Sequence, residues 1–396
     1  MEKARILQIN ANYGFGSTGL IMKDIDELIS RQPDLESFVA FQRSNAKKES
    51  GIKIGNSVDW KLHALFSRIL GRQGFYSGNA TKRFTSTIDK IRPDIVHLHN
   101  LHSNYVNIEI LLNYLAKKDI PVIITMHDCW WFTGKCFHYI DVNCNKFKIG
   151  CGGCPKRKAP PASLFFDRSG NVYQHKKSAL LAIPRLTMVG CSDWICNEAK
   201  KSFLNGVDIT RIYNGIDTSV FRPLPTTRKS NFTVLGMANK WLSERNKDLI
   251  PKILKETTSD ITLVGCSESQ QNYLHQYGSR ISSLGFISDR DELAKIYNSA
   301  DVFINVTHAD TLPTVNMEAI CCGTPVITYN STGSPELVGP ETGFIVEEDD
   351  QQQIVDLINH AQLPDRKMCS AVGKQSFNKD NCYQGYINLY RTILKK

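Results

Sequence analysis

The chain has 396 residues, of which 41% are hydrophobic and 22% charged, a composition typical of a globular protein and not of a disordered chain. Its net charge of +9 is modest for this length and favours an anionic substrate or membrane surface, so we expect no nucleic-acid partner. No apolar run reaches the roughly 18 residues that span a bilayer, and the polar N-terminus resembles no signal peptide, so we expect a cytoplasmic protein.

Short apolar segments alternate with helical patterns along the first half of the chain. This alternation predicts a parallel sheet built from right-handed strand–helix–strand units. The expected strands cover residues 5–10, 94–100, 121–127, 187–192 and 210–213.

A second set of strands follows residues 221–230, a stretch rich in Pro, Thr and basic residues that we interpret as a linker. These strands are expected at residues 232–237, 260–264, 281–286, 300–306 and 325–329. The predicted fold is therefore α/β, with two Rossmann-like domains facing a cleft. The expected parts are an N-terminal domain (1–220) with a cysteine-containing insertion (129–160), the linker, a C-terminal domain (231–378), and a last helix (379–396) that packs back toward the N-terminal domain.

Two features in the first half lie where strands end, which is where parallel sheets bind ligands. A glycine loop, with Gly14, Gly16 and Gly19, follows the first strand and lets the backbone approach a phosphate or sugar; an ordinary strand–helix turn is the alternative. His127 ends the third strand and is either a residue of the cleft or a histidine satisfied by local hydrogen bonds. We predict that His97, His99 and His102, which end a neighbouring strand, are mostly structural.

The helical pattern at residues 59–72 has apolar and basic residues on different faces. Leu62, Leu65, Phe66, Ile69 and Leu70 share one face, and Lys61, Arg68 and Arg72 lie elsewhere. A packing helix is the commoner explanation. The alternative is a helix that rests on an anionic membrane near a lipid-linked acceptor, as a peripheral contact with the inner face of the membrane.

Four of the 12 cysteines gather in one short segment: Cys136, Cys144, Cys151 and Cys154. The Cys-Gly-Gly-Cys end has the form of a zinc knuckle, because small residues let both thiolates point at one metal. Structural zinc and ordinary thiols are the leading interpretations, and disulfides are disfavoured in a reducing compartment. Four sulfur ligands would close the site, so we expect no catalytic metal.

The most informative stretch spans residues 308–327. A strand ends before it, Thr311 is predicted to cap a helix, Pro313 fits the first helical position, and Gly323 ends the helix. A helix N-terminus at the carboxyl edge of a sheet favours a phosphate. Asp310 lies at its mouth and Glu318 can accept both hydroxyls of a ribose; an acidic loop residue and a solvated helix residue are the alternative.

Asp-Thr-Leu-Pro-Thr-Val-x-x-Glu-Ala-x-x-Cys-Gly-Thr-Pro-Val-Ile, from residue 310 to 327, resembles the signature of retaining glycosyltransferases of family 4, which have the GT-B fold. The family usually has Glu in the first position. Asp occurs there in a polysaccharide-building branch, which includes the colanic-acid-type transferases and which this chain resembles more closely. The Gly-Ser-Thr-Gly loop and His127-Asp-x-Trp also resemble that branch.

The resemblance implies roles for particular residues. Asp310 and His127 would lie by the transferred sugar as catalytic residues, and Glu318 would bind the nucleotide ribose. Lys247 matches the family's diphosphate-binding lysine, whereas its arginine has no clean match; Lys240 or Arg245 could substitute. Backbone groups complete the expected donor site, from Gly16, Thr311, Leu312, Pro313 and Thr314.

We therefore predict a retaining, hexosyltransferase-type enzyme of surface polysaccharide or lipopolysaccharide biosynthesis. It would move a sugar from a nucleotide diphosphate sugar to a glycan or lipid-linked acceptor, with no cofactor required for catalysis. The alternatives are a nucleotide-sugar epimerase of the same fold and a zinc-stabilised binding module.

Overall fold

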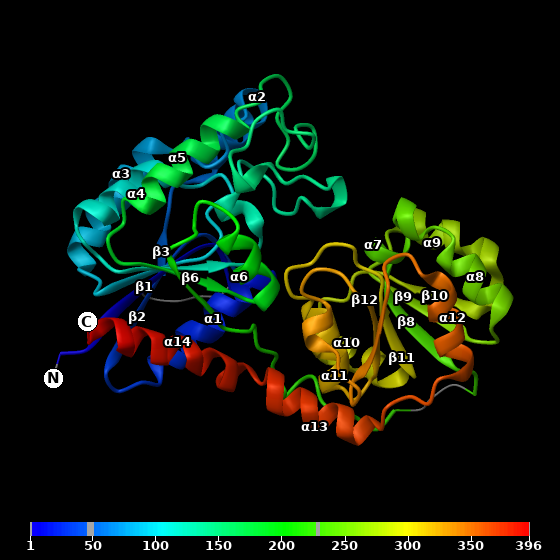
Figure 1. The fold of residues 1–396 in the computed structure, drawn as a ribbon. Helices are drawn as coiled ribbons and strands as arrows, with labels where there is room; N and C mark the ends of the chain where they lie inside the picture. The colour runs from blue at the N-terminus through cyan, green and yellow to red at the C-terminus, as the bar shows by residue number, and fades with distance from the viewer. Residues whose placement is uncertain (1, 46–50, 227–229, 396) are drawn as a thin grey trace. The chain divides into compact units, whose positions relative to one another are not determined.

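The computed structural model describes residues 2–45, 51–226 and 230–395. The chain divides into two compact units (Figure 1). The N-terminal unit contains Met1–Tyr213 and Tyr383–Lys396, and the C-terminal unit contains Asn214–Cys382. Each unit has one parallel sheet with helices on both faces, as the sequence predicts.

The sheet of the N-terminal unit has the order β3-β2-β1-β4-β5-β6-β7, and all of its neighbouring strands are parallel. Its strands are β1 (Ala4–Tyr13), β2 (Leu35–Ser44), β3 (Gly51–Lys53), β4 (Ile95–Leu98), β5 (Val122–Met126), β6 (Leu186–Gly190) and β7 (Asp208–Arg211). The order reverses between β1 and β4, so the loops that leave these strands diverge and open a ligand-binding position at the carboxyl edge.

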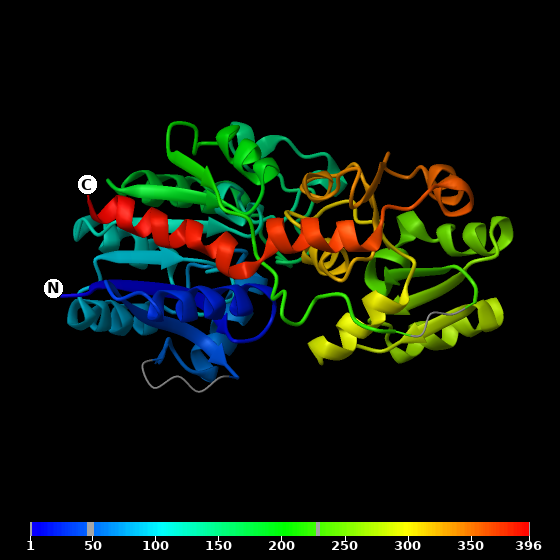
Figure 2. The ribbon, with the colours of Figure 1, turned by 90° about the horizontal axis from the view of Figure 1, so that it is seen from below.

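The helices of this unit form two layers. On one face, α4 (Ile108–Lys117) lies between α3 (Gly78–Ile91) and α5 (Ser169–Leu181), and α1 (Ser17–Ser30) and α14 (Lys379–Leu394) lie on the other (Figures 1 and 2). The remaining helices are α2 (Ser57–Leu70), α6 (Asp193–Lys200) and the 3-10 turns η1 (Cys129–Phe132), η2 (Ile140–Val142) and η3 (Lys146–Lys148).

Helix α14 is fixed to the N-terminal unit by polar contacts as well as by its buried tyrosine rings. The Tyr386 hydroxyl lies 2.8 Å from Thr125 Oγ1, and the Tyr390 hydroxyl lies 2.8 Å from His97 Nδ1. Arg391 forms a two-pronged pair with Asp34, with distances of 2.7 and 2.8 Å. The end of the chain therefore covers the carboxyl-terminal halves of β4 and β5.

The sheet of the C-terminal unit has the order β10-β9-β8-β11-β12-β13, again with parallel neighbours. Its strands are β8 (Thr233–Met237), β9 (Asp260–Val264), β10 (Ile281–Leu284), β11 (Val302–Asn305), β12 (Val326–Tyr329) and β13 (Gly343–Val346). Its helices are α7 (Ala238–Trp241), α8 (Leu249–Glu256), α9 (Glu268–Leu274), α10 (Arg290–Ser299), α11 (Thr314–Cys321), α12 (Gln351–His360) and α13 (Arg366–Phe377), with 3-10 turns at η4 (Glu244–Asn246), η5 (His275–Arg280) and η6 (Pro335–Leu337). The strand order reverses between β8 and β11.

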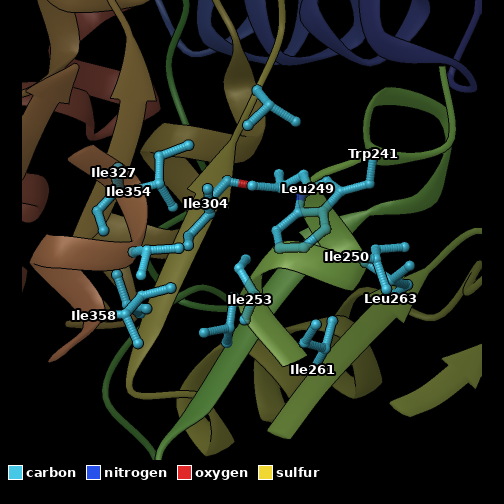
Figure 3. Close-up of a cluster of buried hydrophobic side chains, with 14 of the residues drawn as sticks. Trp241, Leu249, Ile250, Ile253, Ile261, Leu263, Ile304, Ile327, Ile354 and Ile358 are labelled. Carbon is cyan, nitrogen blue, oxygen red and sulfur yellow. Dashed lines mark hydrogen bonds between the residues drawn. The ribbon is translucent and has the colours of Figure 1, made fainter. Parts of the chain in front are cut away.

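A buried cluster of large apolar side chains fills the space between this sheet and helices α8 and α12 (Figure 3). Trp241 lies in it fully buried, and its indole N–H donates a hydrogen bond to the carbonyl oxygen of Ile304 at 2.9 Å. A Cβ atom on Gly236 would lie 2.1 Å from the Trp241 ring, so only glycine fits at this point of β8. This packing fixes α7 at the end of β8, which positions the site described next.

Candidate active site

A cavity of about 450 Å³ opens at the carboxyl edge of the C-terminal sheet. Met237, Val264 and Asn305, which end β8, β9 and β11, line it. The cavity therefore lies at the reversal of strand order, where open parallel sheets bind ligands. The rest of its lining comprises the glycine and apolar residues Gly265, Phe286, Ile287, Leu293 and Val315 and the polar residues Asn239, Lys240 and Asp310.

Helix α11 points its N-terminus at this cavity. The helix begins at Thr314, Pro313 occupies the N-cap position, and no side chain caps it. The prediction that Thr311 caps the helix and that Pro313 is its first residue is wrong. The Asp310 carboxylate instead accepts a hydrogen bond from the backbone N–H of Leu312 at 3.2 Å, and this turn keeps residues 310–312 outside the helix. The uncapped first turn leaves backbone donors for an anion.

Asp310 is held by a second loop. The Thr332 hydroxyl accepts from the backbone N–H of Asp310 at 3.0 Å and lies 2.6 Å from its carbonyl oxygen. The N–H of Gly333 donates to the same carbonyl at 3.2 Å. Both loops at the cavity mouth are therefore fixed to each other before any ligand binds.

Thr311 and Ser334 are buried beside these loops, and their hydroxyl groups have no hydrogen-bond partner within the residues that the structure describes. A buried hydroxyl without a partner costs stability, commonly about 1 to 3 kcal/mol. Such groups are typical of positions that a ligand or an ordered water completes.

Glu318 lies behind the cavity, one turn along α11 from the lining residue Val315. The Tyr297 hydroxyl from α10 donates a hydrogen bond to Glu318 Oε2 at 3.0 Å. Burial raises the pKa of Glu318 to about 7, opposed by the Tyr297 hydrogen bond and the charge of Arg290. A carboxylate at this depth gains from donors that a ligand brings, such as ribose hydroxyls.

The three basic residues after β8 that could bind a diphosphate have different surroundings in the structure. Lys240 lines the cavity. Lys247 is 62% exposed on the next turn, and its ammonium group lies 3.5 Å from Glu244. Arg245 pairs with Glu348 at 3.2 Å and with Asp349 at 2.5 Å, so acidic groups already neutralise it. The geometry therefore favours Lys240, which sequence matching offered only as a substitute for the missing arginine.

In the N-terminal unit, the glycine loop lies between β1 and α1. Gly16 has a φ of 65° and occupies the N-cap position of α1, which has no side-chain cap. Gly14 donates its N–H to the carbonyl oxygen of Gly19 at 2.9 Å, which closes the loop. A Cβ on Gly19 would lie 3.1 Å from Asn12, so the close packing of loop on strand explains this glycine.

His127 follows β5 and joins a chain of buried hydrogen bonds. Its Nε2 lies 3.1 Å from His99 Nδ1, and His99 Nε2 lies 3.2 Å from the Gln8 amide oxygen. The Gln8 amide nitrogen donates to the Met22 carbonyl, which fixes the orientation of the amide. Because an amide oxygen only accepts, His99 carries its proton on Nε2, and His127 must donate from its own Nε2.

This series of hydrogen bonds leaves Nδ1 of His127 unprotonated, as the hydrogen-bond acceptor of that ring. Burial lowers the pKa of His127 to about 4 and that of His99 well below its usual value, so both rings are neutral at pH 7. His97, which contacts Tyr390 and Thr125, and His102, 3.0 Å from Asp128, have structural partners as predicted. His99, for which the sequence also predicts a mostly structural role, hydrogen-bonds to His127 at 3.1 Å and to Gln8 at 3.2 Å.

The cysteine segment lies in the N-terminal unit. The Cys136 thiol hydrogen-bonds to Cys154, and this bond lowers the pKa of Cys154, as do the backbone N–H of Lys156 and the charge of Lys135. The backbone N–H of Gly134 donates to Cys151 Sγ at 3.1 Å. Nevertheless, among the described residues no three cysteine sulfur atoms lie within 4.8 Å of one another. The zinc site stays a prediction.

Among the described residues, three side chains do bring potential metal-ligand atoms within 4.8 Å of one another: His308, Glu348 and Asp349. Arg245 contacts both carboxylates. His308 also lies 3.2 Å from the Asn246 side-chain oxygen. A cation is therefore already present between the acidic groups, and the arrangement is that of an ion-pair network.

Family models match both units. Residues 41–220 match the model described as Glycosyltransferase Family 4, and residues 233–361 match the model described as Glycosyl transferases group 1. With two parallel-sheet Rossmann-like units and a cavity at a sheet edge, the chain is a GT-B-type glycosyltransferase. The epimerase and the zinc-stabilised binding module are thus not favoured.

A putative colanic acid biosynthesis glycosyl transferase of Escherichia coli K12, WcaC, is 23% identical over 98% of this chain and 100% of its own length. Sucrose-phosphate synthase from Thermosynechococcus elongatus has the same fold, with a TM-score of 0.67, 14% identity, and coverage of 99% of this chain and 100% of its own. HepE from Anabaena, solved in complex with UDP, aligns with a TM-score of 0.64 and 16% identity over 98% of this chain and 100% of its own.

Every helix in the described residues is too short or too polar to cross a bilayer.

Proposed function

We propose that this glycosyltransferase transfers a hexose from a nucleotide diphosphate sugar to a glycan or lipid-linked acceptor, with retention of anomeric configuration, in surface polysaccharide biosynthesis. The reaction takes place in the cytoplasm, with peripheral contact with the inner face of the membrane. The similarity to a putative colanic acid biosynthesis glycosyl transferase over its full length supports a role in polysaccharide biosynthesis. The observation that carries the donor site is the cavity that unites Lys240, Asp310 and the uncapped start of α11.

The cavity suits each part of a nucleotide diphosphate sugar. The ammonium group of Lys240 and the backbone donors at Thr314 and Val315 bind the diphosphate. The exposed ring of Phe286 and the neighbouring Ile287 offer an apolar surface for the base. UDP in the HepE complex gives a precedent for such a ligand on this fold.

Two acidic groups complete the donor site. The Glu318 carboxylate, partly buried beside Tyr297, accepts hydrogen bonds from the ribose hydroxyls. Asp310 is held at the mouth of the cavity by the 332–333 loop and orients the transferred sugar. Catalysis then depends mainly on stabilising the departing diphosphate, which needs positioned donors and no metal.

The N-terminal unit supplies the acceptor side. The glycine loop at Gly16 and the unprotonated Nδ1 of His127 lie at the carboxyl edge of its sheet. A neutral histidine that presents a lone pair accepts a hydrogen bond from a sugar hydroxyl without adding charge. His127 therefore orients the sugar and does not serve as a cation.

The test uses labelled UDP- and GDP-sugars with the full chain, with and without a lipid-linked glycan acceptor. Nucleotide release that depends on the acceptor, with a glycosylated product of retained configuration by NMR, is the expected result. Isomerised sugar without acceptor would mean an epimerase, and release of free sugar and nucleotide with no glycosylated product would mean that the acceptor class is wrong. An Asp310→Asn variant should bind nucleotide but lose transfer, which separates chemistry from folding.

A further inference from the structure

We propose that the N-terminal unit docks on an anionic phospholipid membrane through one apolar surface, and that a cationic cavity beside it binds lipid phosphate groups. This inference rests on the proposed function for the acceptor, which it specifies as membrane-borne. The surface, which we name the α2 face, consists of exposed side chains of α2 and of the 164–166 segment: Val58, Leu62, Leu65, Phe66, Leu70, Leu164, Phe165 and Phe166.

Helix α2 turns its apolar side away from the protein. Of its residues, His63 and Ser67 are the buried ones, whereas Leu62 is 48% and Leu65 51% exposed. A helix that packs on its own domain has the opposite arrangement. The packing helix that the sequence favours is thus seen on the side of His63 and Ser67, while the leucine side chains of α2 stay about half exposed.

Polar contacts explain why α2 keeps this orientation. The backbone N–H of Gly74 donates to His63 Nε2 at 3.2 Å, and His63 Nδ1 lies 2.9 Å from the Ser77 hydroxyl. Burial lowers the pKa of His63 to about 3, so the ring is neutral and both nitrogens are satisfied. Rotating α2 to bury its leucines would remove these bonds from a buried histidine.

The second apolar segment lies directly against α2. The backbone N–H of Leu164 donates to the carbonyl oxygen of Arg68 at 2.8 Å. A Cβ on Gly71 would lie 2.5 Å from the Ser163 hydroxyl, so the end of α2 and this segment touch. Leu164, Phe165 and Phe166 are 44%, 69% and 46% exposed, which makes one continuous apolar surface with α2.

This surface is formed before it meets a partner. Asn56 and Asp59 form a capping box at the start of α2, and Gly71 ends the helix with a φ of 72°. Both ends are thus stabilised locally. An amphipathic helix that is already folded loses little conformational entropy when it binds a membrane.

Basic residues favour a membrane over a second apolar protein surface. Lys61, Arg68 and Arg168 are exposed around the α2 face, and the Arg168 guanidinium lies over the Phe166 ring at 5.6 Å. Cations that flank an apolar patch match the charge of acidic headgroups, with the acyl boundary taking up the leucine and phenylalanine side chains.

A cavity of about 680 Å³ adjoins the first turns of α2 and adds a phosphate site. Its lining includes Arg43, Lys53 and Lys61. Trp60 of α2 and Phe15, which lies in the glycine loop, also line it. Within the described residues, none of the three cations has an acidic partner; Arg43 lies over the Trp60 ring at 4.6 Å. Lys61 is one turn from both Val58 and Leu65, so the cavity and the α2 face share an edge.

The cavity thus connects the membrane surface with the glycine loop that the proposed function assigns to the sugar site. A lipid-linked acceptor has the matching chemistry, because its phosphate groups stay near the headgroup region while its glycan extends from it. Phosphate on an ordinary acidic lipid has the same charge, and the experiment separates the two sources.

The test is flotation of the full chain with vesicles of phosphatidylcholine alone, with added phosphatidylglycerol, or with added polyprenyl diphosphate. We expect binding to both acidic compositions and little to phosphatidylcholine. Removing Arg43, Lys53 or Lys61 should weaken binding about fivefold each. If the parent binds polyprenyl diphosphate vesicles more tightly and these variants lose that preference, the cavity binds the acceptor. If the variants lose only their binding to phosphatidylglycerol vesicles, the cavity binds lipid headgroups.

The double variant Leu65→Glu with Phe165→Glu tests the α2 face, and Leu181→Glu, a leucine with 48% exposure on α5, is the matched control. The double variant should lose flotation while the control keeps it, and both should retain the parent's thermal shift with UDP or GDP. Equal binding of double variant and parent would overturn the proposal. A parent protein that is a dimer, together with a double variant that is a monomer, would also overturn it, since a second copy would then cover the α2 face.

Flotation needs no nucleotide, and the thermal shift needs no membrane. Failure of the docking surface and failure of the donor site are therefore distinguishable in the same set of variants.

Discussion

Nδ1 of His99 lies 3.1 Å from Nε2 of His127, and this contact sets the tautomer of the His127 ring, which directly follows β5. The Gln8 amide oxygen accepts a hydrogen bond from His99, and His99 in turn accepts one from His127. His99 is therefore a positioning residue, because it acts through His127.

His99→Phe should lower kcat about 100-fold with a smaller change in KM for the donor, since His127 loses its fixed orientation and tautomer. His99→Gln should recover part of the rate, because a glutamine amide offers one acceptor and one donor. Steady-state kinetics of both variants, beside thermal unfolding, checks this. Equal losses in His99→Gln and His99→Phe, matched by equal loss of stability, would reduce His99 to a packing role.

The two lysines after β8 should differ in their effect on nucleotide binding. Lys240→Ala should weaken UDP or GDP binding about 10- to 100-fold, because it removes a charged hydrogen bond to phosphate. Lys247→Ala should have a smaller effect, as its ammonium group is exposed and outside the cavity lining. Calorimetric titration measures both, with the exposed Lys255→Ala of α8 as control. A larger loss in Lys247→Ala would restore the assignment made from the family motif.

Glu318 should make the nucleotide-free protein less stable as pH rises. Its pKa is raised from 4.5 to about 7 by burial, so the folded state favours the protonated carboxyl group. Its favourable contribution is complete below the unfolded pKa of 4.5 and is lost as pH rises to 7, a change of about 3 kcal/mol.

Glu318→Gln keeps an acceptor for Tyr297 and does not titrate. The variant should unfold at a higher temperature than the parent at pH 8, match it more closely at pH 5, and bind nucleotide more weakly at pH 8. Differential scanning fluorimetry at both pH values, with and without UDP or GDP, gives the comparison. Lower stability of the variant at pH 8 would contradict the burial of an ionised carboxylate.

Cys154 should be the first thiol of its segment to react at neutral pH. The hydrogen bond from Cys136 lowers the pKa of Cys154, whereas the pKa of Cys136 is raised by the same bond and by burial. Alkylation with iodoacetamide followed by peptide mass spectrometry should show Cys154 modified first, and Cys136→Ala, which removes the hydrogen-bond donor, should slow this modification. Labelling that needs a chelator and releases zinc would instead establish the structural zinc site.

The sequence predicts most of the strands because buried parallel strands are apolar runs bounded by turns. It does not predict β2, β3 and β13, whose residues are more polar or lie at and near the edges of the sheets. The start of α11 was placed too early because Thr311 has the right type for a cap, while the Asp310–Leu312 turn that excludes it depends on tertiary contacts.

Site prediction was limited in a similar way. Asp310 reaches the cavity as its position in the motif indicates, but the choice between Lys240 and Lys247 depends on where α7 turns, which Trp241 packing decides. The α2 pattern shows which residues share a face. It does not show that a buried histidine, hydrogen-bonded at both nitrogens, turns that face outward.

The division of the chain at Tyr213 and again at Tyr383 makes the C-terminal unit an insertion within the N-terminal one. A fragment cut after residue 213 would leave His97 without the Tyr390 hydroxyl and Thr125 without that of Tyr386. The N-terminal unit thus cannot be made complete by a simple C-terminal deletion. The C-terminal unit, by contrast, is one continuous stretch of chain, so removing it and rejoining the two ends would keep every segment of the N-terminal unit.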